Sequence, residues 1–477
     1  MNGELPKGWV WTSLEKCIDI LDNRRSPINA EEREKRIKDK DQSGLYPYYG
    51  ATGQVGLIDE YIFDEELILL GEDGAPFLDF TKDKSYLIKG KTWVNNHAHV
   101  LRAIKDMSLN SYICHYLNSF DYRNYITGTT RYKLNQSQMR KISIPLPPLA
   151  EQQRIVNKIE ELFTNLDKGV ESLEEVKYKL KVYRQAILKY AMEGKLTEKW
   201  REENKEELIQ DCLLIKSEIK NINKESKYYY YTNEVILHDL PKTWAWVKLE
   251  NISNCLGGYA YKSKDFTENG YQVVKIGNIK MGSLDLDNKP SFIEKIDFNN
   301  IKKYLLLEND VLISLTGTKN KRDYGNVAII KKESNLLLNQ RIGRLRFYSF
   351  VLPKYYYFNL QVENFRNQFF QNETGNVGQG NVGMDAIKST FVTLPTYKEQ
   401  NIIVERIEKL FSLADYIEET VNSKLEQSKI LRQSILKKAF EGKLVPQYPN
   451  DEPAELLLER IKMEKPNKEK LVQEKLI

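Results

Sequence analysis

The sequence predicts an α+β fold in which two globular α/β domains alternate with two long helices that pair antiparallel as a coiled coil. Three observations support this prediction. The chain has 477 residues, enough for more than one domain. Several segments recur in the same order in both halves, which indicates an internal duplication. Each repeat contains a long stretch with apolar residues three or four positions apart, the pattern of an amphipathic helix.

The duplication is clearest in the helical segments. "EQQRIVNKIEELF" (151–163) matches "EQNIIVERIEKLF" (399–411), and "RQAILKYAMEGKL" matches "RQSILKKAFEGKL" at the same offset of 248 residues. Without a gap, 151–196 and 399–444 share 21 of 46 positions. The domain starts "LPKGWVWTSLE" and "LPKTWAWVKLE" also match, 235 residues apart. The sequences in between scarcely match, which favours recognition of two different ligands over two copies of one catalytic site.

The matched segments predict two helices, each roughly 70 Å long at about 1.5 Å per residue. Prolines precede each helix, and Gly194 and Gly442 lie where each ends. A narrow apolar stripe is buried best against a matching helix, so we expect the two to pair, related by a pseudo-twofold axis. An unrelated helical bundle is the alternative. The expected seam residues are Ile155, Ile159, Leu162, Ile187, Ile403, Ile407, Leu410 and Ile435.

These segments set the expected domain boundaries. Within the globular parts, 108–127 and 352–375 read as helices, and short apolar runs read as strands. The boundaries are 1–147 for the first globular domain, 148–222 for a central helical connector, 223–239 for a linker, 240–395 for the second globular domain, 396–445 for a distal helical connector and 446–477 for a C-terminal tail.

One glycine motif raises the question of a cofactor. In "GNVGQGNVGMD" (375–385), Gly378, Gly380 and Gly383 have the G-x-G-x-x-G spacing of dinucleotide-binding sites. Such a site needs a strand before the glycines and a helix after them. Here the preceding residues read as a helix and the following ones as a short strand, and the first half has no equivalent motif. We therefore expect a loop whose backbone approaches a ligand closely, and no cofactor site.

Polar and basic loops are the candidates for ligand recognition. The chain carries 72 Lys and Arg and 29 Tyr, although its net charge is only +5. Arg pairs with guanine and Asn or Gln with adenine in the major groove, whereas Lys mostly contacts phosphate. A plain solvated turn is the alternative for each loop. The candidate DNA-binding residues are Arg131, Tyr132, Lys133, Lys319, Lys321, Arg322, Gln340, Arg341, Gln379 and Asn381, with Arg344 and Arg346 in the same "NQRIGRLR" segment.

The sequence offers no candidate catalytic residue and no candidate metal site. His97 and His99 in "NNHAH" have no carboxylate or cysteine cluster at ligand spacing, so we interpret them as packing or hydrogen-bonding residues. A P-loop is missing. The four cysteines lie far apart, which favours reduced thiols and a cytoplasmic location. No apolar run approaches the ~18 residues of a membrane span, and the N-terminus does not read as a signal peptide.

In the order of its motifs, the chain resembles the specificity subunits of type I restriction-modification systems. The resemblance covers nearly the whole length and rests on the paired helix motifs, the paired domain starts, and "YPYYGATG" with "VNNHAHVLR" in the first half. It implies that each globular domain is a target recognition domain for one half of a split sequence in double-stranded DNA. It also implies that the helices fix the gap between the half-sites.

The resemblance further implies that the chain itself does no chemistry and holds no cofactor. Two methyltransferase subunits are expected to dock on it and to use S-adenosylmethionine, and restriction subunits to use ATP and Mg. Charged helix residues are candidate docking contacts, simple solvation being the alternative: Glu151, Glu399, Arg184 and Arg432. The competing functions are a self-sufficient DNA methyltransferase or nuclease, and a coiled-coil scaffold that does not bind DNA.

Overall fold

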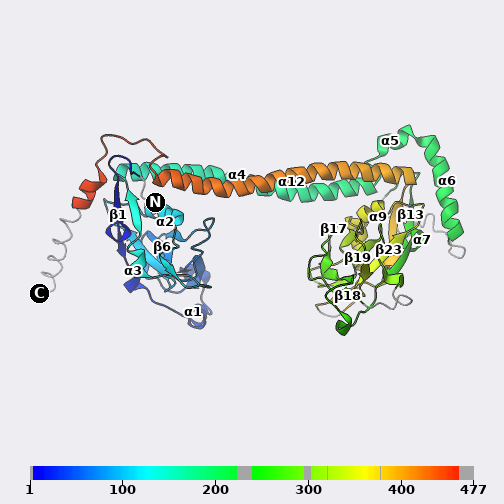
Figure 1. Ribbon diagram of the computed structural model, residues 1–477, viewed down its shortest axis with the longest axis horizontal. Coiled ribbons are helices and arrows are strands. Elements are labelled where there is room, and N and C mark those ends of the chain that lie inside the picture. The colour runs from blue at the N-terminus through cyan, green and yellow to red at the C-terminus, as the bar shows by residue number, and fades with distance from the viewer. Residues whose placement is uncertain (1–3, 223–238, 295–301, 320, 376–377, 461–477) are drawn as a thin grey trace. The chain divides into compact units, whose positions relative to one another are not determined.

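The computed structural model describes residues 4–222, 239–294, 302–319, 321–375 and 378–460. The chain divides into two units (Figure 1). Unit 1 comprises Met1–Glu175 and Val421–Ile477, and unit 2 comprises Val176–Thr420. Each unit therefore joins one globular domain to parts of both long helices, α4 (Leu149–Met192) and α12 (Tyr397–Phe440).

The globular part of unit 1 contains two four-stranded sheets and a separate pair of strands. An antiparallel sheet has the order β2-β9-β6-β7, a second sheet has the order β4-β3-β8-β5, and β1 pairs with β12. The strands are β1 Val10–Ser13, β2 Ile18–Ile20, β3 Tyr46–Gly50, β4 Gly53–Ile58, β5 Phe63–Asp64, β6 Leu67–Gly71, β7 Ser85–Ile88, β8 Lys91–Val94, β9 Ala98–Ala103, β10 Ile126–Thr127, β11 Lys133–Leu134 and β12 Ser143–Leu146. The helices are η1 Leu14–Lys16, η2 Asp22–Arg24, α1 Ala30–Ile37, η3 Gln42–Gly44, α2 Asn110–Ser119 and α3 Gln136–Met139.

Unit 2 has an antiparallel sheet of order β14-β23-β19-β21, a three-stranded sheet of order β18-β15-β22, and the pair β13-β25. The strands are β13 Ala245–Lys248, β14 Ser253–Gly257, β15 Tyr271–Val274, β16 Ile279–Lys280, β17 Ser283–Leu284, β18 Phe292–Ile293, β19 Val311–Ser314, β20 Thr316–Gly317, β21 Val327–Ile329, β22 Leu336–Leu338, β23 Ile342–Phe347, β24 Gly380–Asn381 and β25 Phe391–Leu394. The helices are α5 Glu198–Glu203, α6 Lys205–Ile222, α7 Leu249–Ile252, η4 Ser263–Asp265, η5 Ile276–Asn278, η6 Lys302–Tyr304, α9 Pro353–Asn359, α10 Glu363–Gln371 and α11 Met384–Ser389.

The duplication extends into the globular domains, where the sequence no longer shows it. Strands β2, β9, β6 and β7 correspond in order and direction to β14, β23, β19 and β21. The pairing registers match residue by residue: Asp19↔Arg102 corresponds to Asn254↔Arg346, and Leu70↔His99 corresponds to Ile313↔Gly343. The hydrogen-bonding register therefore shows which residue of one domain is equivalent to which residue of the other.

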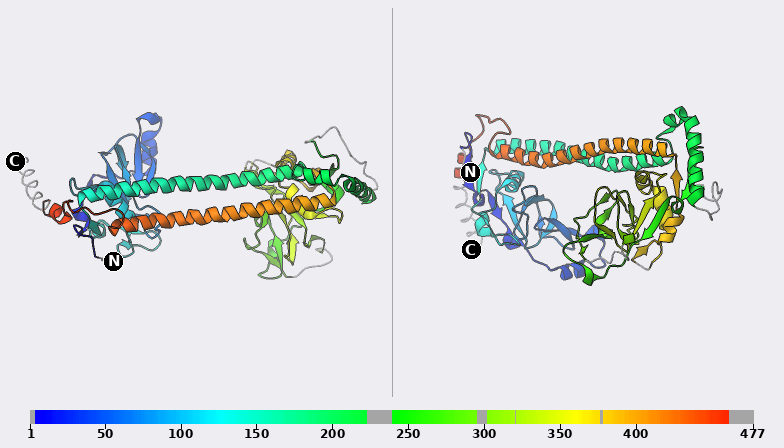
Figure 2. Two further views of the ribbon diagram at one scale, coloured as in Figure 1. Left: turned by 90° about the horizontal axis from the view of Figure 1, so that it is seen from above. Right: turned by 45° about the vertical axis from the view of Figure 1, so that its right-hand side comes forward.

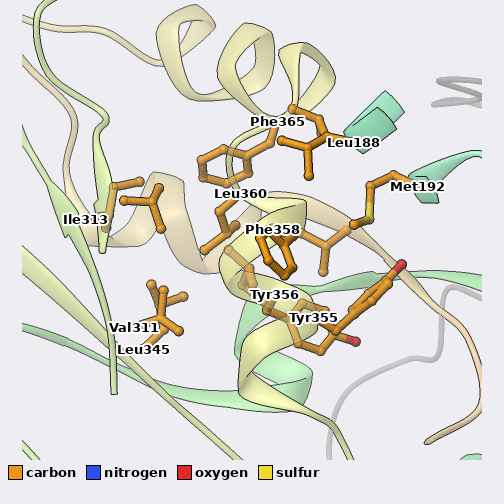
Figure 3. Packing of buried hydrophobic residues seen from close by; sticks show 14 of the residues in the cluster. Leu188, Met192, Val311, Ile313, Leu345, Tyr355, Tyr356, Phe358, Leu360 and Phe365 are labelled. Carbon is orange, nitrogen blue, oxygen red and sulfur yellow. The ribbon is translucent and has the colours of Figure 1, made fainter. Parts of the chain in front are cut away.

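Within each unit, α4 and α12 lie side by side and antiparallel (Figure 2). In unit 1, the start of α4 and the end of α12 share a buried cluster with α2, β12 and η1; in unit 2, the end of α4 and the start of α12 share one with β13, α9 and β19 (Figure 3). The predicted seam residues Ile155, Ile159, Ile187, Ile403, Ile407 and Ile435 are buried in these clusters, with Leu162 and Leu410 packed at their edges. Near their ends, the helices thus bury their apolar stripes against their own domain as well as against each other.

Two arginines link the helices by the same contacts in each unit. Arg184 of α4 bonds Asp415 at 2.6 Å and lies over the ring of Phe411. Its equivalent in α12, Arg432, bonds Asp167 and lies over Phe163. Because each set is the other's counterpart at an offset of 248, the pairing has the pseudo-twofold relation expected from the duplication.

Both helices end at a glycine for the same steric reason. Gly194 and Gly442 have φ of +73° and +68°, a conformation that L side chains rarely adopt. A Cβ on Gly194 would lie 2.5 Å from Pro241, and one on Gly442 would lie 2.2 Å from Pro6. The proline of each "LPK" domain start thus packs directly on the glycine that ends the matching helix.

The helix predictions were too long in two places. The 108–127 segment is helical only over α2, and 352–375 divides into α9 and α10, because Val362 adopts an extended conformation. The 148–222 connector comprises three helices, α4, α5 and α6, with breaks at 193–197 and at Asn204, so the long helix ends close to Gly194 as the sequence predicted. Of the predicted linker, 223–238 lies outside the described residues, as does 461–477 of the predicted tail. Among the described helices, none combines the length and apolar character needed to cross a bilayer.

Candidate nucleic-acid interface

Two loops occupy equivalent backbone positions in the two domains. We call 128–133 the first-domain loop and 375–381 the second-domain loop, each including the start of the strand that follows; 376–377 lie outside the described residues. The first-domain loop leads from β10 into β11, and the second-domain loop follows Thr374, which forms a bridge with Asn381 at the equivalent place. Each loop also pairs with residues just after a strand of the main sheet. Lys133 bridges Asp73, which follows β6, and Asn381 pairs with Thr316, which follows β19.

The equivalent positions carry different side chains. Arg131, Tyr132 and Lys133 of the first domain correspond to Gln379, Gly380 and Asn381 of the second, at an offset of 248. Arg131, Lys133, Gln379 and Asn381 are exposed, and Tyr132 is half-buried. The two loops therefore present different hydrogen-bonding groups from the same backbone frame, as expected of two domains that read different sequences.

Acidic residues hold the basic side chains of the first-domain loop. Arg131 Nε donates to Asp73 Oδ1 at 2.7 Å while its side chain stays 61% exposed, and Lys133 Nζ lies 3.4 Å from Glu72 Oε1. Exposed ion pairs contribute little to stability, roughly 0–1 kcal/mol. Their main effect here is to orient two cations on the surface.

In the second domain the structure brings three predicted clusters together around Leu315–Gly317. Leu315 accepts a hydrogen bond from Val382 N and donates one to Arg341 O, which places the second-domain loop beside Gln340 and Arg341. The 317–326 turn adjoins the same loop, because Gly317 pairs with Gly380 and Arg322 lies over Phe370. Gln340, Arg341, Lys321 and Arg322 are exposed, and Lys319 is partly exposed.

Two arginines of "NQRIGRLR" do not belong to that surface. Arg344 is 4% exposed and donates to Lys303 O and Asn254 Oδ1. Arg346 forms a two-pronged ion pair with Asp310, at 2.7 Å for each contact. Arg344 is buried because β23 is an inner strand of its sheet and residues 342–345 are covered on both faces, and Arg346 is held by Asp310.

The context of the glycine motif is only partly as predicted: a helix precedes the glycines, but a short helix and not a strand directly follows them. Helix α10 precedes the loop, and Gly378 has φ of +96°. One element was missed: Gly383 is the N-cap of the short helix α11, which lies before β25. Gly380 is needed for packing, since a Cβ there would lie 2.3 Å from Tyr324 Oη.

Sequence reasoning missed a buried polar cluster, which we call the His99 network: Asp22, Arg25, Glu72, His99 and Gln136. His99 Nδ1 lies 2.7 Å from Asp22 Oδ2, and Glu72 Oε2 lies 2.7 Å from Arg25. The interpretation of His99 as a hydrogen-bonding residue is confirmed, but its partners were not visible in the sequence, because Asp22 lies 77 residues from His99 and 114 residues from Gln136. Ligand atoms of Asp22, Glu72 and His99 fall within 4.8 Å of one another. The guanidinium of Arg25 already supplies the cation that balances these carboxylates.

Two of the four predicted docking residues are internal. Glu151 and Glu399 are 1% and 0% exposed, and each accepts a hydrogen bond from a domain-start tryptophan: Trp9 Nε1 at 3.1 Å and Trp244 Nε1 at 2.8 Å. The carboxylates thus fasten each helix start to its domain. The other two, Arg184 and Arg432, are engaged between the helices, so none of the four marks a free docking surface.

Comparisons with known proteins agree with this architecture. A family model described as the type I restriction modification DNA specificity domain matches residues 7–178 and 241–427. The chain is 31% identical over 490 residues to the type I restriction enzyme EcoKI specificity subunit of Escherichia coli strain K12, with 97% of each chain covered.

Two solved structures share the fold. The HsdS subunit from Thermoanaerobacter tengcongensis has a TM-score of 0.50 at 17% identity, with 93% of this chain and 99% of that chain covered. A chain from a study of complex assembly and conformational transition of the type I R-M system has a TM-score of 0.59 at 16% identity, with 92% and 100% covered. From the family match and the full-length relative, the chain belongs to the family of type I restriction-modification DNA specificity proteins.

Proposed function

We propose that this specificity subunit reads a two-part DNA sequence, one half with each globular domain. The observation that carries the proposal is the equivalence of the two loops: one backbone frame, set by matching strand registers, presents Arg131 and Lys133 in one domain and Gln379 and Asn381 in the other. Arg suits guanine, and Gln and Asn suit adenine. A two-part target requires two different sets of base-contacting side chains, and equivalent backbone positions carry them in the two domains.

The basic groups beside the loops would position the domains on the duplex. Lys319, Lys321 and Arg322 lie in the turn that adjoins the second-domain loop, and Lys133 ends the first-domain loop. Cations of this kind bind phosphates irrespective of sequence and make affinity depend on salt. We assign these residues to backbone contact, and Gln379, Asn381, Gln340 and Arg341 to base contact.

The long helices would set the gap between the two half-sites. Helix α4 is uninterrupted for 44 residues, beginning in unit 1 and ending in unit 2, and α12 does the reverse. A helix has a fixed rise of about 1.5 Å per residue, so its length converts residues into distance. Deleting helix residues should therefore change the gap without changing either half-site.

Catalysis would come from partner subunits. We propose that two methyltransferase subunits bind the helices and supply S-adenosylmethionine, and that restriction subunits supply ATP and Mg chemistry, in the cytoplasm. Helix α4 carries exposed apolar side chains at Tyr178 and Val182, and α12 carries them at Leu413 and Tyr416. A cavity of about 1010 Å³, lined by the end of α4 and by α10, adjoins Val182. Exposed apolar residues beside a cavity are suited to a protein partner.

A binding selection tests the reading of DNA. The chain would be purified with its methyltransferase subunit and used to select from a random duplex library. We expect a two-part motif. Arg131→Ala with Lys133→Ala should make one half degenerate, and Gln379→Ala with Asn381→Ala the other half. Lys321→Ala should weaken binding to all sequences and lower the salt slope by about 1. Loss of both halves in either loop variant, or an unchanged motif in both, would contradict the assignment.

A further inference from the structure

The first-domain loop is held by a buried, charged hydrogen-bond network. The His99 side chain is 1% exposed, and its two ring nitrogens both face acceptors: Nδ1 lies 2.7 Å from Asp22 Oδ2, and Nε2 lies 2.8 Å from Leu134 O. A carboxylate and a carbonyl oxygen can only accept, so both ring nitrogens must donate. His99 is therefore an imidazolium that links η2 to the end of the first-domain loop.

The remaining members complete that link. Asp22 Oδ2 also accepts from Gln136 Nε2 at 2.9 Å, and Asp22 Oδ1 accepts from Val100 N at 2.8 Å. These bonds, that from His99 foremost, hold the pKa of Asp22 below its usual value although burial alone would raise it. Leu134 N donates to Glu72 O, so Leu134 is bound to the network on both sides.

The charges around His99 are balanced. Arg25 lies 3.6 Å from Asp22 and 2.7 Å from Glu72, and Glu72 lies 3.7 Å from His99 Nδ1. Lys133 faces the other oxygen of Glu72. Two largely buried carboxylates thus face two largely buried cations, with a third cation on the surface. Removing any one would leave an uncompensated buried charge, which is costly.

The second domain holds the same loop end with apolar contacts. The strand registers and the loop bridges identify the equivalent residues of the second domain: Gly343 is equivalent to His99, Gly257 to Asp22, Leu315 to Glu72 and Met384 to Gln136. The Met384 side chain fills the space: a Cβ on Gly343 would lie 2.7 Å from its Sδ, and one on Gly257 would lie 3.2 Å from its Cγ. Val382, the equivalent of Leu134, still donates to Leu315 O.

We propose that His99 is a positioning residue for one half-site: it holds the first-domain loop in its reading conformation, whereas Met384 does this by packing in the second domain. The effect on DNA rests on the proposed function; the effect on the loop does not. Loss of the imidazolium should therefore open one loop only and blur one half of the target only.

The first test measures the loop without DNA. Backbone hydrogen exchange would be followed in the full chain for 126–134 and, as internal reference, for 378–382. His99→Phe keeps a ring but donates to neither partner, and Asp22→Asn is a second variant that keeps size. We expect exchange at 126–134 to accelerate by about tenfold or more in both variants, because His99→Phe leaves Asp22 and Leu134 O without the donor that His99 supplies, and Asp22→Asn removes the charged acceptor of His99. The 378–382 segment should stay within about twofold. His115→Phe, which changes a histidine packed on Phe163 away from the loop, is the matched control.

A spectroscopic test distinguishes positioning from general packing. In ¹⁵N-histidine-labelled protein, His99 should show two protonated ring nitrogens, and Asp22→Asn should remove that signature. A neutral ring in the unmodified protein, unchanged exchange at 126–134, or equal acceleration in both loops would overturn the proposal.

The second test reads the DNA target with the methyltransferase subunit present. His99→Phe should broaden the motif in one half and leave the other half intact. If the loop opens and the motif stays unchanged, His99 still positions the loop, and the assignment of that loop to base reading fails. The two ideas thus fail separately.

Discussion

The two buried glutamates at the helix starts allow a sharp test of how each helix is fastened to its domain. Glu399 accepts from Trp244 at 2.8 Å, from Thr197 at 2.7 Å and from Arg201 Nε at 3.0 Å. Glu151, its equivalent, accepts from Trp9 at 3.1 Å, and no cation bonds it directly among the contacts of the described residues. The perturbation is Glu→Gln at each site, which keeps size and removes charge.

The expected magnitudes differ because only Glu399 has a direct cation. At 3.0 Å and an effective dielectric constant of about 20, the Coulomb attraction of Arg201 is about 5.5 kcal/mol. Desolvation offsets much of it, and a charged hydrogen bond contributes about 1.5–3 kcal/mol net. Glu399→Gln should therefore cost about 2–3 kcal/mol. Glu151→Gln should cost about 1 kcal/mol or less, since it disturbs a hydrogen bond to a neutral donor.

The pH dependence of stability gives a second test at Glu151. Burial raises the pKa of Glu151, against the opposing hydrogen bond from Trp9. A raised folded pKa means that the folded state binds the proton more tightly, so this residue's contribution to stability falls as pH rises through that pKa. The penalty of Glu151→Gln should therefore shrink between about pH 4 and pH 7.

The assay must resolve the two units. Urea titrations followed by hydrogen exchange would report unfolding separately for peptides around Glu151 and around Glu399. We expect Glu399→Gln to lower the midpoint only in the second set of peptides, and by more than Glu151→Gln lowers it in the first. Equal penalties, or a larger one at Glu151, would refute the reasoning that Arg201 makes the difference.

Three further predictions concern the helices and one histidine. Gly194→Ala and Gly442→Ala should each cost at least about 1 kcal/mol in urea titrations, because of positive φ and the facing prolines, whereas Gly169→Ala, in open space within α4, should add up to about 1 kcal/mol. Burial lowers the pKa of His115 to about 4, so wild-type stability should fall as pH drops from about 6.5 towards 4; His115→Phe should flatten that fall. Deleting one seven-residue repeat from both α4 and α12 should shorten the gap in the DNA motif and preserve both halves; an unchanged gap would exclude the helices as the spacer.

The sequence was sufficient for the architecture because its evidence was local and repeated. The 3–4 spacing of apolar residues, the prolines before each helix and Gly194 and Gly442 at the ends are properties of neighbouring residues. A gapless match between the two connectors then implied two equivalent helices. The helix limits of 108–127 and 352–375 failed because an extended residue such as Val362 has no strong sequence signature.

The sites depended on contacts that sequence separation hides. Glu151 looks like any surface residue of a charged helix, yet Trp9 from 142 residues away buries it. In the sequence Arg344 looks like a DNA-contacting residue, yet its position on β23 buries it in the domain. The His99 network joins η2, β9 and α3 to Arg25 and Glu72, which lie just after η2 and β6, and only His99 of the "NNHAH" motif stood out in the sequence. For Glu151 the sequence did contain a usable signal. A Trp at each domain start and a Glu at each helix start both recur at matching positions of the two halves.

A methylation map tests the central claim most directly. The chain and its candidate methyltransferase subunit would be expressed together and separately in an unmethylated host, and N6-methyladenine would be mapped across the genome. We predict a two-part motif that appears only when both proteins are present, with one half altered by Arg131→Ala and Lys133→Ala. Methylation by this chain alone, or a motif from the methyltransferase subunit that does not change when this chain is absent, would contradict the claim that this chain supplies the sequence specificity.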